Sequence, residues 1–204
     1  MEAVTYSRVC EAPSFPWFDE NAYYKSALVY RLPPDLEGRV DQCRKLLADQ
    51  VSAPYQTQPH MTLCYLGCNH GREMVELWHR LGKTALPRLE IRITGLATFE
   101  RQGRVANIHA RVQGTPDVQA AHEKTLRICR QSSWFQPGAY AGKGYIPHIS
   151  IFEGIEHVDD LSDVVPFSKM LVGTHLLQTV CIMSLRLTPV MVVNLEVRPQ
   201  EDLL

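Results

Sequence analysis

Two short segments share one pattern, Pro59-His60-Met61-Thr62-Leu63 and Pro147-His148-Ile149-Ser150-Ile151. Each reads proline, histidine, apolar residue, hydroxyl residue, apolar residue, and a glycine follows shortly after each. Side chains alternate between the two faces of a strand, so residues i and i+2 share a face. If both segments are strands, each therefore presents an imidazole and a hydroxyl on one face and apolar side chains on the other.

The flanking sequence indicates two similar halves. In the first half we expect a strand at 26–32, a helix at 34–51, a strand at 60–66 and a helix at about 72–82. In the second half we expect paired strands at 89–99 and 105–112, a helix at 116–131 and a strand at 148–152. The stretches 179–187 and 190–197 predict a C-terminal hairpin. Residues 1–24 are predicted to be an N-terminal arm, and residues 25–204 a single bilobal domain.

Composition excludes several classes of protein. The chain has 204 residues, 45% of them hydrophobic, which is enough for a packed core. With 21 basic and 22 acidic residues the net charge is −1. Binding to long nucleic acids depends on many Lys and Arg side chains, so we do not expect it here. The start of the chain lacks a signal-peptide pattern, and the longest uncharged stretch, 170–185, is too short to span a bilayer. We therefore expect a cytoplasmic protein, with no membrane partner and with reduced cysteines.

The paired histidines and hydroxyls suit phosphodiester chemistry. In-line attack at phosphorus needs a base on one side and an acid on the leaving oxygen, and histidine can serve as either near neutral pH. Hydroxyl groups can donate hydrogen bonds to the non-bridging oxygens as negative charge develops. If the halves are related by a pseudo-twofold axis, the two polar faces meet across one cleft. No metal or cofactor is needed for this scheme.

Two metal hypotheses are weaker alternatives. Cys64 and Cys68 are followed by His70, but no second pair has zinc-site spacing. The two motif histidines could also bind a metal, but no third ligand recurs with them. The remaining histidines have no such repeat and are expected at the surface or in the core; they are residues 70, 79, 109, 122, 157 and 175.

The two His-x-[Thr/Ser] motifs, the strand and helix before the first, and the run Thr62-Leu63-Cys64-Tyr65-Leu66-Gly67 resemble the 2H phosphoesterase superfamily, nearest to its 2′,5′-RNA ligase-like proteins and cyclic phosphodiesterases. The resemblance covers residues 25–197. It implies an α+β fold in which antiparallel sheets line a central cleft and helices lie outside. It also implies metal-independent cleavage of 2′,3′-cyclic phosphates or 2′,5′-linked nucleotides.

Carried over to this sequence, the resemblance makes His60 and His148 the acid/base pair, with Thr62 and Ser150 binding phosphate. The chain departs from the ligase-like branch at Glu153, where that branch often has a basic residue. We expect a monomer acting on a small nucleotide, a cyclic oligonucleotide signal or an RNA terminus. The alternatives are a non-catalytic nucleotide- or RNA-binding module and an RNA end-joining ligase.

Further substrate-binding candidates are aromatic residues and cations near the motifs. Strand parity favours Phe152, which shares the face of His148 and Ser150, whereas Tyr65 has the opposite parity and is expected in the core. The remaining candidates for base stacking are Tyr30, Trp134 and Tyr145, and those for phosphate contacts from loops are Arg101, Arg104 and Lys143.

Overall fold

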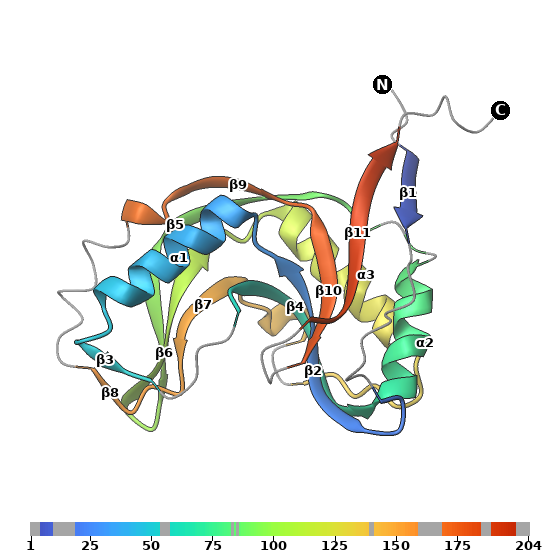
Figure 1. The fold of residues 1–204 in the computed structure, drawn as a ribbon, viewed down its shortest axis with the longest axis horizontal. Coiled ribbons are helices and arrows are strands. Elements are labelled where there is room, and N and C mark those ends of the chain that lie inside the picture. The colour runs from blue at the N-terminus through green and yellow to red at the C-terminus, as the bar shows by residue number, and fades with distance from the viewer. Residues whose placement is uncertain are drawn as a thin grey trace.

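The computed structural model of the protein describes residues 5–9, 19–53, 58–82, 84, 86–138, 141–158, 169–184 and 189–198 (Figure 1). The helices are α1 (Pro34–Leu46), α2 (Gly71–Gly82) and α3 (Pro116–Cys129), with a 3₁₀ turn η1 (Gly142–Gly144). The strands are β1 (Thr5–Val9), β2 (Tyr23–Arg31), β3 (Val51–Ser52), β4 (His60–His70), β5 (Leu89–Arg101), β6 (Arg104–Val112), β7 (His148–Glu153), β8 (His157–Val158), β9 (Gly173–Leu177), β10 (Thr179–Ser184) and β11 (Pro189–Arg198).

Most of the predicted elements are confirmed, including the antiparallel pairing of β10 with β11. The helix predicted at 34–51 ends at Leu46 instead. Val51 keeps the helical spacing, but it lies in the short strand β3, which pairs with β8. Its side chain is buried from that position in the strand rather than from a helix. Of the predicted arm, Thr5–Val9 forms β1 beside β11 and Tyr23 begins β2. Residues 1–4 and 10–18 of it lie outside the described residues.

One sheet joins both halves of the chain. Its order is β1-β11-β10-β2-β4-β7-β6-β5-β9, and every neighbouring pair is antiparallel. In the middle of the sheet, β4 pairs with β7 at Met61 and Ile149, the equivalent residues of the two motifs. An antiparallel pair has a local twofold axis between its partners, so this axis relates the two motifs.

The two faces of the sheet differ in what covers them. Leu28, Tyr30 and Met61 belong to the main core, together with apolar side chains from α1, α2 and α3. Ala27 and Val29, on the other face of β2, form a small separate cluster with Cys181 and Met183. His60 pairs with Arg31 and Thr62 with Val29, so both motif residues lie on this second face, which we call the polar face.

Each half contributes a helix to the other half. The first half runs β2-α1-β4 and the second runs β6-α3-β7, yet α1 contacts β7 and α3 contacts β4. A single residue, Gln178, separates β9 at one edge of the sheet from β10 on the other side of the axis. Figure 1 shows β9 passing over the top of the molecule into β10, so the sheet is strongly arched. This is the predicted α+β architecture of two antiparallel halves.

Helix α3 begins as the sequence predicts. The Thr115 hydroxyl accepts a hydrogen bond from the Val118 N–H, and Pro116 follows at the first helical position. Such a cap contributes about 1 kcal/mol. Buried Val118, Ala121 and Leu126 anchor the helix on the core. Among the described residues, no helix is long and apolar enough to cross a membrane.

Candidate active site

The polar face brings the four motif residues together around the central strand pair. His60 and Thr62 come from β4, and His148 and Ser150 from β7. The two histidines are close enough that the charge of His148 affects the pKa of His60. His60 and Ser150 are buried, whereas Thr62 and His148 are half-buried. The predicted quartet is therefore one cluster.

Both histidines are held by the same contact. Nδ1 of His60 donates to the Gln58 carbonyl at 2.7 Å, and Nδ1 of His148 donates to the Ile146 carbonyl at 2.8 Å. A residue before proline is restricted to extended backbone, so Pro59 and Pro147 fix the position of these carbonyls. Because a carbonyl can only accept, the proton lies on Nδ1 and leaves Nε2 to accept or give a proton.

The pKa of His60 lies below its ordinary value of 6.5. Burial is the largest cause, since it disfavours the charged imidazolium, and the charges of His148 and Arg44 act in the same direction. The Gln58 carbonyl and the Glu153 carboxylate oppose the shift. His60 is therefore neutral near pH 7, which is the form a general base requires.

Both motif strands contain a bulge directly after the hydroxyl residue. On β4, Thr62 pairs with Val29 and Cys64 with Leu28, so Leu63 is the extra residue. On β7, Ser150 pairs with His109 and Phe152 with Ile108, so Ile151 is the extra residue. An extra residue shifts the alternation of side chains beyond it.

The bulges reverse two sequence predictions. Phe152 lies in the main core at 2% exposure, so its ring has no face for a nucleobase. Tyr65 pairs with Ala27 on the polar face and is 43% exposed. Glu153 also reaches the polar face, opposite Asn107. Simple alternation placed Phe152 and Tyr65 on the wrong faces because it assumed unbroken strands.

A hydrogen-bonded chain that the sequence reading missed leads to Ser150. Nδ1 of His109 donates to Oδ1 of Asn107 at 3.1 Å, and Nδ2 of Asn107 donates to the Ser150 hydroxyl oxygen at 3.1 Å. With its oxygen already accepting, Ser150 can direct its own O–H toward a ligand. Asn107 and His109 are two apart on a predicted strand, so the parity rule used for the motifs could have found them.

Aromatic rings pack around His148. The His109 ring stacks on Phe99 with centroids 4.1 Å apart and meets the edge of His148 at 5.1 Å; Phe99 lies 5.0 Å from His148. Burial, with the charges of His148 and Arg111, lowers the pKa of His109 from 6.5 to about 4. His109 is therefore a buried, neutral hydrogen-bonding residue beside the motif residues; the sequence placed it at the surface or in the core and gave it no role there.

The other three aromatic candidates support the sheet. Tyr30 is fully buried and donates its hydroxyl proton to the Pro87 carbonyl. The Tyr145 hydroxyl donates to the Thr62 carbonyl at 2.8 Å, and its ring stacks on His122 at 3.9 Å. Trp134 packs against the main core. Tyr30 and Tyr145 are thus committed to internal contacts, which corrects the prediction that they stack on a base.

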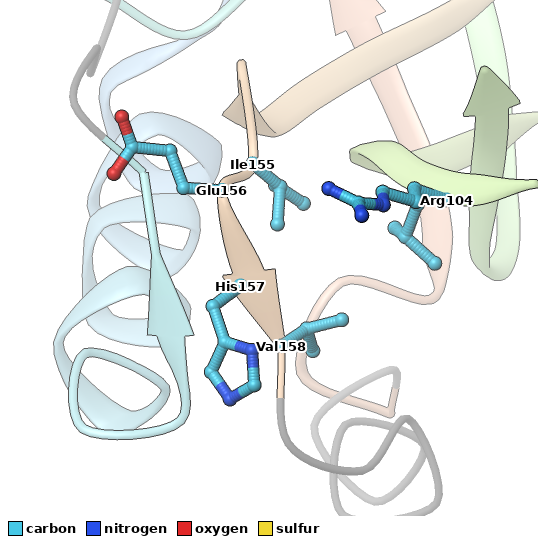
Figure 2. A pocket seen from close by; sticks show the side chains of 6 residues that line it. Arg104, Ile155, Glu156, His157 and Val158 are labelled. Atoms are coloured by element: carbon cyan, nitrogen blue, oxygen red, sulfur yellow. The ribbon is translucent and has the colours of Figure 1, made fainter. Parts of the chain in front are cut away.

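The three predicted cations lie in exposed turns. Arg101 and Arg104 flank the β5–β6 turn, and Lys143 lies in η1. Arg104 lines a pocket of about 410 Å³ with Val105, Ile155, Glu156, His157 and Val158. Figure 2 shows the Arg104 side chain extending toward Ile155, with Glu156 directed to the far side. None of these three cations is among the groups that affect the pKa of His60.

No group of three or more metal-ligating side chains is present in the part of the chain that the structure describes. Cys64 is buried near Cys129 of α3, whereas Cys68 is exposed. The zinc hypothesis based on Cys64 and Cys68 therefore lacks a shared site.

The chain matches the family model of the 2′-5′ RNA ligase superfamily over residues 32–164. Among solved structures, it is similar to Escherichia coli LigT complexed with 3′-AMP, at TM-score 0.60 and 12% identity, over 80% of this chain and 88% of LigT. It is equally similar to a structure described as a phosphoesterase, at TM-score 0.60 and 10% identity, over 80% and 88% of the two chains. A search of the curated proteins finds no match.

The family match includes both motifs, and the solved structures confirm the arrangement of the sheet. The repeated histidine and hydroxyl pairs lie on one face of this sheet, around one local twofold axis. The protein therefore belongs to the 2′-5′ RNA ligase superfamily of 2H phosphoesterases.

Proposed function

We propose that this protein is a metal-independent phosphodiesterase that cleaves 2′,3′-cyclic phosphates or 2′,5′-linked nucleotides. The observation that carries the proposal is the pair of histidines, both with the proton on Nδ1, gathered with two hydroxyls on one face of the sheet. Family membership supports phosphodiesterase or ligase-type chemistry at this site.

His60 is the proposed general base for hydrolysis of a cyclic phosphate. Its lowered pKa keeps Nε2 unprotonated near neutral pH, so it can take a proton from water as the water oxygen attacks phosphorus. His148, the more exposed of the pair, acts in its doubly protonated form: Nδ1 keeps its proton on the Ile146 carbonyl, and Nε2 gives its proton to the ribose oxygen that leaves. For a 2′,5′-linkage, His60 instead deprotonates the neighbouring 3′-hydroxyl, and the product is a cyclic phosphate.

The two hydroxyls would stabilise the charge that develops on phosphorus. In this proposal Thr62 and Ser150 donate hydrogen bonds to the non-bridging oxygens, which gain negative charge as the nucleophile adds. The Ser150 hydroxyl oxygen accepts a hydrogen bond from Asn107, which is itself held by His109, so the hydroxyl proton of Ser150 points away from Asn107. Removing one such preorganised donor typically lowers kcat about 10²–10³-fold.

The polar face also offers groups for the rest of a nucleotide. Arg31 pairs with His60 on β2, and Arg111 pairs with His148 on β6, so each histidine has an arginine as its cross-strand neighbour. Tyr65 supplies an exposed aromatic ring on this face for stacking on a base. Together with a net charge of −1, these local groups favour a small or terminal phosphodiester over a long polyanion.

A substrate panel tests the proposal. The purified protein is incubated with 2′,3′-cyclic mononucleotides, 2′,5′-linked dinucleotides and oligonucleotides, cyclic oligonucleotides and 3′,5′-linked controls, and the products are separated by chromatography. We expect turnover of a 2′,3′-cyclic or 2′,5′-linked substrate, and at least about 10²–10⁴-fold slower turnover by the double variant His60→Ala, His148→Ala. Tight binding without product would favour a nucleotide-binding module, and joined RNA ends would favour a ligase.

A further inference from the structure

The two bulges are equivalent under the pseudo-twofold axis. The extra residues Leu63 and Ile151 are 88 positions apart, the same separation as the two histidines. A bulge takes its extra residue out of the hydrogen-bond ladder and can redirect neighbouring side chains. Each extra residue directly follows a hydroxyl residue of the site, so the two bulges lie where a small change of direction would move those hydroxyls.

Both extra residues are held by a buried side chain. Nδ1 of His122 donates to the Leu63 carbonyl at 2.7 Å, and Nε of Arg44 donates to the Ile151 carbonyl at 2.8 Å. His122 is 2% exposed and Arg44 6%. Two unrelated side chains therefore satisfy equivalent carbonyls, in a place where the ladder is interrupted.

Each donor comes from the opposite half. His122 is on α3 of the second half and holds β4 of the first, whereas Arg44 is on α1 of the first half and holds β7 of the second. These two hydrogen bonds, which we call the cross-half contacts, tie each hydroxyl-bearing strand to the helix of the other repeat.

Each donor is itself fixed. Nε2 of His122 accepts the Gly142 N–H at 2.9 Å, so the ring is neutral with its proton on Nδ1, and it stacks on Tyr145. Arg44 donates to Asp41 at 3.2 Å, and the carboxylate of Glu153 also acts on it. A buried guanidinium is costly to desolvate, and these two carboxylates offset part of that cost. Because burying the Arg44 guanidinium is costly, we expect its hydrogen bond to the Ile151 carbonyl to have a functional consequence.

We propose that His122 and Arg44 are positioning residues that aim the hydroxyls of Thr62 and Ser150, respectively, at the phosphate by holding the two bulges. The inference rests on the proposed function. It assigns each hydroxyl a positioning side chain from the opposite repeat, in addition to the contacts that Tyr145 makes with the Thr62 carbonyl and Asn107 with the Ser150 hydroxyl. Loss of a cross-half contact should therefore lower kcat with little effect on KM, since it misaligns a group that acts mainly in the transition state.

Double-mutant cycles test this assignment. His122→Leu and Arg44→Met each remove one donor, and a small misplacement in an active site can cost about 10–100-fold in kcat. If His122 acts through Thr62, His122→Leu should cost almost nothing further in a Thr62→Val background. The same holds for Arg44→Met in a Ser150→Ala background. The crossed pairs, His122 with Ser150 and Arg44 with Thr62, should be additive.

Three controls separate positioning from stability. His122→Asn keeps an N–H donor close to the position of Nδ1, so it should restore most of the kcat lost in His122→Leu. Arg44→Lys keeps the charge without the Nε donor, so it should remain impaired. Ile128→Ala removes a buried side chain from the same helix α3 and should lower Tm without coupling to either hydroxyl. Additive losses in both matched cycles would overturn the proposal.

Hydrogen exchange distinguishes this inference from the proposed function. His122→Leu should speed amide exchange in 60–66 on β4, and Arg44→Met in 148–153 on β7, each with the opposite strand unaffected. A wild-type protein that turns over no phosphodiester would refute the proposed function, while exchange would still report whether each side chain holds its strand. Unchanged exchange in both variants would refute the cross-half contacts themselves.

Discussion

Two matched alanine variants, Phe152→Ala and Tyr65→Ala, test directly whether the bulges place these side chains as the structure shows. Unbroken alternation places Phe152 with His148 and Ser150, whereas the bulge at Ile151 places it in the main core at 2% exposure. Phe152→Ala therefore removes a buried ring. Such substitutions cost about 3–5 kcal/mol, from lost burial and the cavity that remains. In a protein of this length, 1 kcal/mol lowers Tm by about 2–4 °C, so the expected fall is about 6–20 °C.

Tyr65→Ala is the matched variant, because the bulge at Leu63 moves Tyr65 to the polar face at 43% exposure. We expect its free energy of unfolding to fall by less than about 1 kcal/mol. If Tyr65 stacks on a base, a loss of about 1–3 kcal/mol in binding would raise KM about 5- to 150-fold. Thermal unfolding by circular dichroism and steady-state kinetics measure both quantities. A stable Phe152→Ala with a raised KM, beside an unstable Tyr65→Ala, would refute the register.

Three further predictions concern charge and metal. The acidic limb of kcat/KM should have its midpoint below pH 6.5, because the base His60 must be unprotonated and its folded-state pKa is lowered; a midpoint above 6.5 would contradict that role. Stability should fall as pH drops from 6.5 toward 4, where unfolded chains protonate His109 and the folded protein does not, and urea unfolding of His109→Gln should show a smaller fall. Turnover should be unchanged after dialysis against EDTA, whereas a loss that zinc restores would favour the metal hypothesis.

The sequence was sufficient for the motif, the two halves and most elements, because strand parity and helical spacing are local. Parity alone grouped His60 with Thr62 and His148 with Ser150, and the structure places each pair on one face. The same rule would also have grouped Asn107 with His109. That pair does not recur in the other half, so the sequence repeat that marks the four motif residues does not mark Asn107 and His109.

The bulges could not be predicted, and errors at Phe152 and Tyr65 followed from them. Leu63 and Ile151 are ordinary strand residues, with no glycine or proline to mark a break in alternation. Each cross-half contact joins residues that are far apart in the sequence: Arg44 and Ile151 are separated by 107 positions, and His122 and Leu63 by 59. Local sequence patterns do not encode such packing. The predicted helix 34–51 extends past the observed end of α1 at Leu46, because Val51 fits the helical spacing but is a buried residue of strand β3.

The rate of phosphodiester cleavage by His60→Ala, His148→Ala and the double variant tests the central claim most directly. It is measured at saturating substrate on the best substrate of the panel, with folding checked by circular dichroism. Each single variant should lose about 10²–10⁴-fold in kcat, and the double variant little more than the worse single one, because base and acid act in one transition state. Retention of wild-type kcat in both single variants would contradict two-histidine catalysis.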